Sequence, residues 1–161
     1  MGERRFTHTD ATGKMRMVDV SRKRPTRREA LASCLVRTTA TVESLRHAEG
    51  DVDSLHVSRL AGIQAAKHTA DLIPLCHPLN LEQVLVDVTP APEGFRVEAR
   101  VVTVSRTGVE MEALTACAVA AVSLVSSLRT VDHDALVDEV VLERKSGGKS
   151  GEWGRQVDGR D

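Results

Sequence analysis

The stretch LAGIQAAKHTADLIPLCHPL, residues 60–79, begins with the pattern of a helix and ends with that of a constrained loop. Alanine and glutamine favour helices, and apolar residues and Lys67 recur there at the spacing of one helical face. The pattern predicts a helix that is capped by Asp51 or Asp53 and runs to about Ala70.

Two prolines constrain the loop that follows this helix. Pro74 ends the helix, because proline lacks a backbone donor and clashes with the preceding turn. Pro78 restricts the preceding His77 to an extended conformation. Cys76 and His77 are therefore expected on a short rigid segment, which suits a binding site better than a linker.

A β-hairpin is predicted directly after the loop. Residues 81–89 place valines on one face, and residues 95–104 alternate apolar residues with arginine and glutamate. The turn between them holds two prolines and a glycine in residues 90–94. Both strands are therefore expected to be buried on one face only.

A long helix is predicted from Thr107 to about Val131, followed by a last strand at residues 136–143. Apolar residues cover nearly every face of this helix, which is typical of a helix buried on all sides. Since one sheet cannot cover it in so small a chain, part of the helix is expected to pack against another subunit.

The N-terminal part of the chain is basic and less regular. Residues 15–20 predict a short strand or a packed arm, and residues 22–28 form a basic run. We interpret the basic run as a solvated, mobile arm, with an arm that reaches phosphates or a neighbouring subunit as the alternative. An edge strand at residues 28–38 and a short helix at residues 41–47 are expected next, before a turn at Glu49-Gly50-Asp51.

The predicted order is strand, helix, strand, strand, helix, strand. This is the split βαβ pattern of an α+β, ferredoxin-like fold, with a four-stranded antiparallel sheet and two main helices packed on one face. We expect an N-terminal arm at residues 1–26, a single domain at residues 27–153 and a flexible C-terminal tail at residues 154–161.

Composition excludes several classes of protein. The net charge is −1 and only 2% of the 161 residues are aromatic, which argues against a nucleic-acid binder and predicts an aliphatic core. Three cysteines without a CxxC motif predict reduced thiols in a cytoplasmic protein. The first residues lack the apolar region of a signal peptide, and the longest apolar run is too short to span a bilayer.

Two carboxylates open the long helix, at Glu110 and Glu112. The helix dipole favours carboxylates there, so simple capping explains them as well as a site does. Residues two apart point to different sides of a helix, so one carboxylate must lie near the apolar side. That carboxylate needs a lysine, an arginine or a ligand as its partner.

The loop KSGGKSG, residues 145–151, resembles a phosphate-binding loop in composition only. The first glycine of the P-loop motif would fall on Glu143, and no helix follows. Its backbone N–H groups and its lysines, Lys145 and Lys149, can still close over phosphates. The alternative is a disordered basic tail.

Cys76 and His77 allow three interpretations. A structural zinc site lacks further ligands at suitable spacing, so His77 is better explained as a hydrogen-bonding or proton-transfer group. Cys76 could act as a nucleophile, but nothing beside it in sequence activates it. The candidates combine into one polar site for an anionic, phosphorylated ligand and acid–base chemistry, formed with arginines by Lys67, His77, Glu110, Glu112, Lys145 and Lys149.

Five blocks of the sequence resemble cyclic pyranopterin monophosphate synthase, the molybdenum cofactor biosynthesis protein C family. They are MVDVS at 17–21, AGIQAAK at 61–67, DLIPLCHPL at 71–79, TGVEMEALTA at 107–116 and KSGGKSG at 145–151. The resemblance implies a ferredoxin-like subunit in a homohexamer, a trimer of dimers with active sites between subunits. It implies no metal and no cofactor of the protein's own, with Mg²⁺ considered only as a companion of the triphosphate.

The implied activity is that of a phosphorus–oxygen lyase in molybdenum cofactor (molybdopterin) biosynthesis. A cyclised dihydro-GTP nucleotide is rearranged to cyclic pyranopterin monophosphate, and pyrophosphate leaves. The resemblance assigns Lys145 as a catalytic lysine on the terminal loop. It places the substrate beside Lys67, Leu75, Cys76, His77, Glu110, Met111 and Glu112.

Three departures from the family pattern concern catalysis. Ser126 stands where a catalytic aspartate is expected, Arg129 replaces a lysine, and Glu49 reverses the charge of a lysine. Arginine can hold phosphate but transfers protons poorly, and serine supplies no carboxylate. Two hypotheses follow: a synthase, weakened or helped by Asp132 and Asp134, or a catalytically impaired paralogue that binds the nucleotide or assembles with an active synthase.

Overall fold

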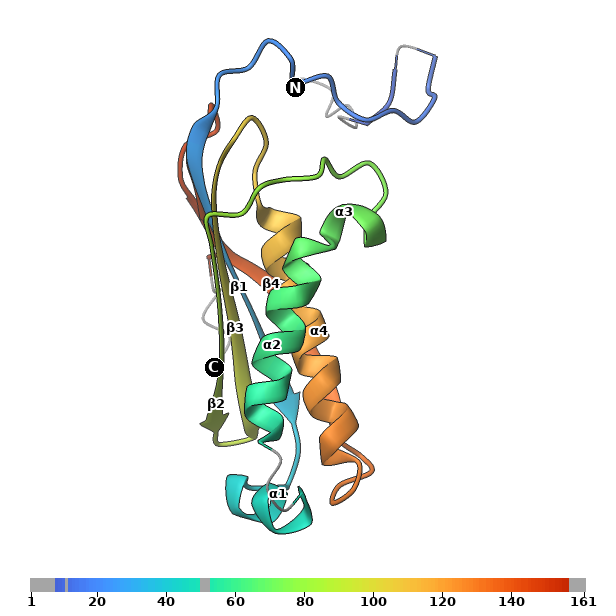
Figure 1. Cartoon of the computed structure of the whole chain (residues 1–161), viewed down its shortest axis with the longest axis vertical. Helices are drawn as coiled ribbons and strands as arrows, with labels where there is room; N and C mark the ends of the chain where they lie inside the picture. Colours follow the sequence, from blue (N-terminus) through green and yellow to red (C-terminus); the bar gives the residue numbers. More distant parts are fainter. Residues whose placement is uncertain (1–7, 11, 50–52, 157–161) are drawn as a thin grey trace.

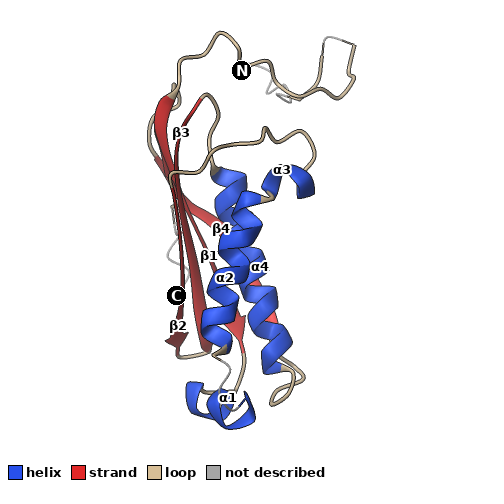
Figure 2. Cartoon of the chain, in the orientation of Figure 1, coloured by secondary structure: helices blue, strands red, loops and turns tan. Residues whose placement is uncertain are grey.

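The computed structural model describes residues 8–10, 12–49 and 53–156, although the side chains of residues 48 and 49 are excepted. It is an antiparallel sheet with the long helices on one face (Figures 1 and 2). In chain order the elements are β1 Thr26–Arg37, α1 Val42–Glu49, α2 Ser54–Lys67, α3 Thr69–Leu72, β2 Gln83–Ala91, β3 Gly94–Ser105, α4 Glu110–Leu128, β4 Leu136–Ser146 and β5 Trp153–Gly154.

The ferredoxin-like α+β prediction is confirmed. The strands lie in the order β2-β3-β1-β4-β5, and the first four give the expected split βαβ arrangement. The sheet has five strands and not the predicted four, because Trp153 and Gly154 pair with Lys145 and Arg144 at the edge of β4.

The prediction that residues 28–38 form an edge strand is wrong. β1 lies between β3 and β4 and pairs with both. Alternate residues such as Ala30, Cys34 and Val36 are buried beneath the helices. Alternation along a strand reports which face is buried, but it carries no information on whether the two edges are paired.

Helix α2 begins as predicted but ends earlier. Asp53 is its N-cap and accepts a hydrogen bond from the backbone N–H of His56 at 3.0 Å, whereas Asp51 and the turn at Gly50 lie outside the described residues. The helix breaks at His68, before the single turn of α3. The Thr69 hydroxyl bonds back to carbonyls of the last turn of α2, which competes with the regular helical pattern.

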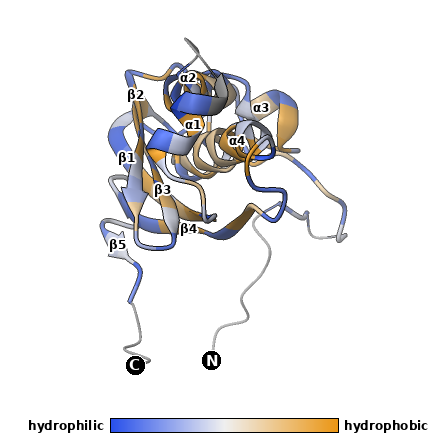
Figure 3. Cartoon of the chain, turned by 90° about the horizontal axis from the view of Figure 1, so that it is seen from below, coloured by the Kyte–Doolittle hydropathy of each residue, from blue (hydrophilic) through white to orange (hydrophobic). Residues whose placement is uncertain are grey.

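The two long helices approach each other closely at Gly62. A Cβ atom at this position would lie 2.8 Å from the carbonyl oxygen of Ala116 and 3.0 Å from the Cβ of Ala120. Seen along the long axis of the molecule, α2 and α4 lie side by side on one side of the strands (Figure 3). Glycine at 62 therefore sets the distance between the helices.

Helix α4 is largely buried, as the sequence predicts, and the core is aliphatic except for Phe95. Its 19 residues would be long and apolar enough to cross a membrane by composition alone, but here half of them are buried against the sheet and α2. Val122 is 61% exposed, so one strip of the helix layer has no cover within this chain.

The described part of the N-terminal arm passes over the end of the molecule where α3 lies and then projects beyond it (Figure 1). Thr9 and Met15 form an isolated bridge around a turn in which the Asp10 carboxylate accepts three hydrogen bonds. The 15–20 segment forms no regular strand; Val18 and Val20 are half-buried. The predicted short strand therefore does not form, and the predicted packing of the arm holds only for Val18 and Val20.

Candidate active site

A cavity of about 430 Å³ lies at the end of the sheet where α4 begins. Its walls come from the arm, the start of β1, the loop after α3, the loop before α4, the first turn of α4 and β4. The predicted residues that line it are Leu75, Cys76, His77, Glu110, Met111, Glu112 and Lys145. Segments far apart in sequence thus meet at one point.

The Pro74–Pro78 loop is as constrained as the sequence predicts. The backbone N–H of Cys76 donates to the carbonyl of Ile73 at 3.3 Å, which closes a turn with Pro74 at its second position. Leu75 at the third position has φ of 67°, a conformation usually left to glycine. Such strain costs about 1–3 kcal/mol and is typical of functional sites. It turns the loop so that Leu75, Cys76 and His77 all face the cavity.

Glu110 and Lys145 form an ion pair in the cavity wall. The Lys145 Nζ donates to Glu110 Oε1 at 2.8 Å, and each side chain is less than a third exposed. The Glu110 carboxylate folds back against Gly108, where any Cβ atom would collide with it. The absence of a Cβ atom at Gly108 leaves room for this carboxylate beside the loop before α4.

Glu112 is the buried carboxylate that the sequence predicts beside the apolar side of the helix. It is 4% exposed. Burial, and next the negative charge of Glu110, raise the pKa of Glu112 to about 7. A carboxylic acid that titrates near neutral pH can both donate and accept a proton under physiological conditions.

The Cys76 thiol is unsuited to nucleophilic attack. Burial, and then the charge of Glu112, raise its pKa above the ordinary value, so the thiolate is disfavoured. His77 is half-buried beside it and lines the same wall. In the same cavity, the buried hydroxyl oxygen of Thr107 has no hydrogen-bond partner among the described residues. A ligand could satisfy that hydroxyl.

Basic side chains and one histidine, which the sequence did not single out individually, complete the wall. Arg28 donates to the carbonyls of Ser105 and Arg106 at 3.1 and 3.2 Å, and its guanidinium packs against Gly148. His8, Lys23 and Arg106 also line the cavity. For Lys23 and Arg28 the only sequence signal was the basic run at residues 22–28, which left open whether the arm reaches a ligand. Arg106 and His8 lie outside that run.

Four predicted site residues lie outside this cavity. Lys67 is exposed at the end of α2, and Lys149 is exposed in the glycine-rich turn. Ser126 and Arg129 are exposed at the far end of α4. Ser126 is fourteen residues beyond Glu112, which corresponds to about 21 Å along a helix. Within one chain, Ser126 and Arg129 therefore cannot join the cavity.

Asp132 does not replace the missing carboxylate in this cavity. It lies beyond the same far end of α4 and accepts hydrogen bonds from the Thr38 hydroxyl at 2.7 Å and the Thr39 backbone N–H at 2.9 Å. These hydrogen bonds lower the pKa of Asp132 to about 2. Its role is to hold the end of β1. Among the residues that the structure describes, no cluster of three metal-ligating side chains occurs.

Comparison with known proteins identifies the family. The model of the MoaC family matches residues 17–148. The chain belongs to the MoaC family. This agrees with the resemblance carried by the five sequence blocks, all of which lie at least partly inside the matched range.

Several relatives match nearly the whole length of this chain. One from Nocardioides sp., named cyclic pyranopterin monophosphate synthase, is 52% identical over 94% of this chain and 96% of its own length. Relatives with the same name from Thermomicrobium roseum and a Nostoc species are 51% and 46% identical over 95% and 92% of the chain. These proteins are similar in length as well as in sequence.

Proposed function

We propose that this protein is a cyclic pyranopterin monophosphate synthase of molybdenum cofactor biosynthesis. It converts the cyclised dihydro-GTP nucleotide to cyclic pyranopterin monophosphate and releases pyrophosphate. The observation that carries the proposal is the cavity itself: a buried carboxylic acid that titrates near pH 7 and a lysine–glutamate ion pair face a cluster of cationic side chains.

The two kinds of group have different roles in the proposal. Arg28, Lys23 and Arg106 offset the charge of the triphosphate, and arginine suits phosphate oxygens because of its planar, forked donors. Glu112 and Lys145 exchange protons with the ring and hydroxyl groups that react. Mg²⁺, if used, enters with the triphosphate as part of the substrate.

A complete site needs a second copy of the chain. We propose that Ser126 and Arg129 face the substrate from a neighbouring subunit, because they are exposed and their own cavity lies out of reach. Lys67, exposed at the end of α2 that leads into α3, is proposed to contact the substrate as well. This agrees with the uncovered strip of the helix layer at Val122. The proposed assembly is a cytoplasmic homohexamer, a trimer of dimers.

Serine at 126 and arginine at 129 are proposed to slow the reaction without abolishing it. Proton-transfer groups are each worth about 10²–10⁴ in rate, and neither replacement transfers protons readily. An impaired paralogue is the less favoured alternative, since relatives of nearly equal length and about half-identical sequence carry the synthase name.

The test is a turnover assay with the purified protein. Incubation with the cyclised nucleotide is expected to yield pyrophosphate and the pterin product, whereas tight binding without product would contradict the proposal. The double variant Ser126→Asp/Arg129→Lys should turn over faster than the natural chain. An unchanged rate would mean that the site uses other groups for these proton transfers.

A further inference from the structure

A second pocket of the described chain lies at the opposite end of the sheet from the candidate site. It encloses about 910 Å³ between the end of β1, the start of α1 and the β2–β3 turn. Pro90, Pro92 and the half-buried Val42 give it apolar walls. Nothing in the proposed reaction uses this groove.

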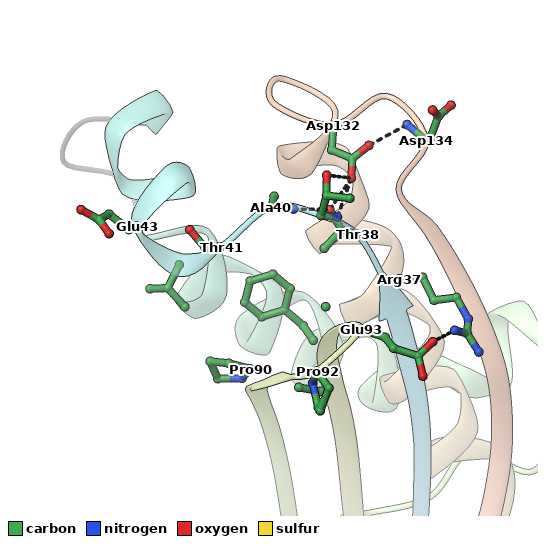
Figure 4. A pocket seen from close by; sticks show the side chains of 15 residues that line it. Arg37, Thr38, Ala40, Thr41, Glu43, Pro90, Pro92, Glu93, Asp132 and Asp134 are labelled. Atoms are coloured by element: carbon green, nitrogen blue, oxygen red, sulfur yellow. Dashed lines mark hydrogen bonds and ion pairs between the residues drawn. The ribbon is translucent and has the colours of Figure 1, made fainter.

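The groove has an acidic rim. Four acidic side chains line it, together with one basic side chain, Arg37. Arg37 is already paired with Glu93 and with Asp138. Glu43 and Asp134 lie on opposite sides of the pocket, and neither forms an ion pair with a described residue (Figure 4). The groove is therefore suited to an apolar segment flanked by positive charge.

The projecting arm has these properties. Met15 is 70% exposed and Met17 is 49% exposed, and Lys14 and Arg16 alternate with them. In extended backbone the two methionines share one face and the two basic residues share the other. Two large apolar side chains on a projecting hairpin are costly in water unless another surface covers them.

The arm cannot readily fill the groove of its own chain. β1 has 12 residues, so its two ends lie about 36 Å apart at the rise of a strand. The chain from Met15 to Thr26 reaches at most about 39 Å, and only when fully extended. Instead it turns at Val20–Lys23, is held by the Arg106 side chain at the Lys23 carbonyl, and leaves in the other direction.

We propose that residues 14–17 of one copy dock into the acidic groove of a second copy. Met15 and Met17 cover the apolar walls, while Lys14 and Arg16 meet Glu43 and Asp134 at the rim. Asp132, three residues beyond Arg129, lines the groove. The contact therefore lies beside the end of α4 that would contribute residues to the proposed shared active site. The docking is argued from complementary charge and from the length of the arm, so it does not require that the proposed reaction be correct.

A photo-cross-linker at Met15 tests the contact directly. The full chain with p-benzoylphenylalanine at position 15 is prepared in light and heavy nitrogen isotopes, mixed under conditions that allow subunits to exchange, and irradiated. Cross-links from a light chain to residues 38–43 or 90–95 of a heavy chain are expected. Cross-links confined to one isotope, an absence of cross-links in the assembled protein, or a protein that sediments as a monomer at micromolar concentration would each overturn the proposal.

Charge exchange adds a specific control. Lys14→Glu/Arg16→Glu and Glu43→Lys/Asp134→Lys should each lower the yield of intermolecular cross-links about tenfold, and the four changes together should restore at least about half of it. The pair Glu82→Lys/Asp87→Lys changes exposed acidic residues outside the groove and should have no effect. Failure of restoration with intact folding, measured by circular dichroism, counts against the pairing.

Discussion

Glu112 makes the stability of this protein depend on pH in an unusual direction. Its pKa is about 7 in the folded chain, against an ordinary value of 4.5, so the folded state holds an extra proton between these values. Stability therefore falls as pH rises from about 4.5 to 7 and stays low above that range. Glu112→Gln should remove this dependence and stabilise the protein by about 1–3 kcal/mol at pH 8.

The measurement is urea unfolding of both proteins at pH 5 and pH 8. The difference in unfolding free energy should be present at pH 8 and small at pH 5. Glu82→Gln, a change at an exposed position, is the matched control. Equal unfolding free energies at pH 8 would mean that Glu112 is ionised without penalty in the folded protein.

Lys145 is the residue whose loss should cost the most activity. It touches Glu110 at 2.8 Å and faces the cavity, so under the proposed function its charge serves the phosphates of the substrate as well as the ion pair. Lys145→Met is expected to lower kcat about 10²–10⁴-fold. Arg155→Met removes an exposed charge outside the cavity and should change kcat little. A small loss with Lys145→Met would assign the proton transfers to another group.

At the scale of the elements, the contact between α2 and α4 depends on Gly62. Alanine favours helices over glycine by up to about 1 kcal/mol, but its Cβ would lie 2.8 Å from the Ala116 carbonyl. Overpacking costs about 1–3 kcal/mol, so Gly62→Ala should lower the unfolding free energy despite the better propensity. Gly154→Ala, which meets no close atom, is the control, and thermal unfolding of both variants decides the sign.

The sequence predicted the helices and strands better than it predicted which strands pair with one another. The hairpin of β2 and β3, the long α4 and the ferredoxin-like order follow from periodicity, because alternation and helical spacing report which faces are buried. The central place of β1 and the short strand β5 could not be predicted in this way, because strand pairing at an edge leaves no periodic signal.

The prediction of the candidate site from the sequence has the same limit. Cys76, His77, Glu110 and Glu112 could be proposed from local chemistry, since prolines constrain the loop and a helix dipole favours the acids. That Lys145 lies within 2.8 Å of Glu110 depends on the pairing of β4 with β1, which brings residues 35 positions apart together. Lys23 and Arg28 line the same cavity, and their charge was the only sequence signal for them.

At the scale of the whole molecule, the separation of Lys145 from Arg129 predicts that active sites are shared between copies. Arg129 lies beyond the last turn of α4, whereas Lys145 pairs with Glu110 at its first turn. Lys145→Ala and Arg129→Ala should each be nearly inactive alone. Mixed under conditions that allow exchange, they should regain about a quarter of the natural activity, because in a symmetric dimer of two different variants one of the two sites has both natural halves. Native mass spectrometry would establish that mixed assemblies have formed; if these remain inactive, each site is built from a single chain.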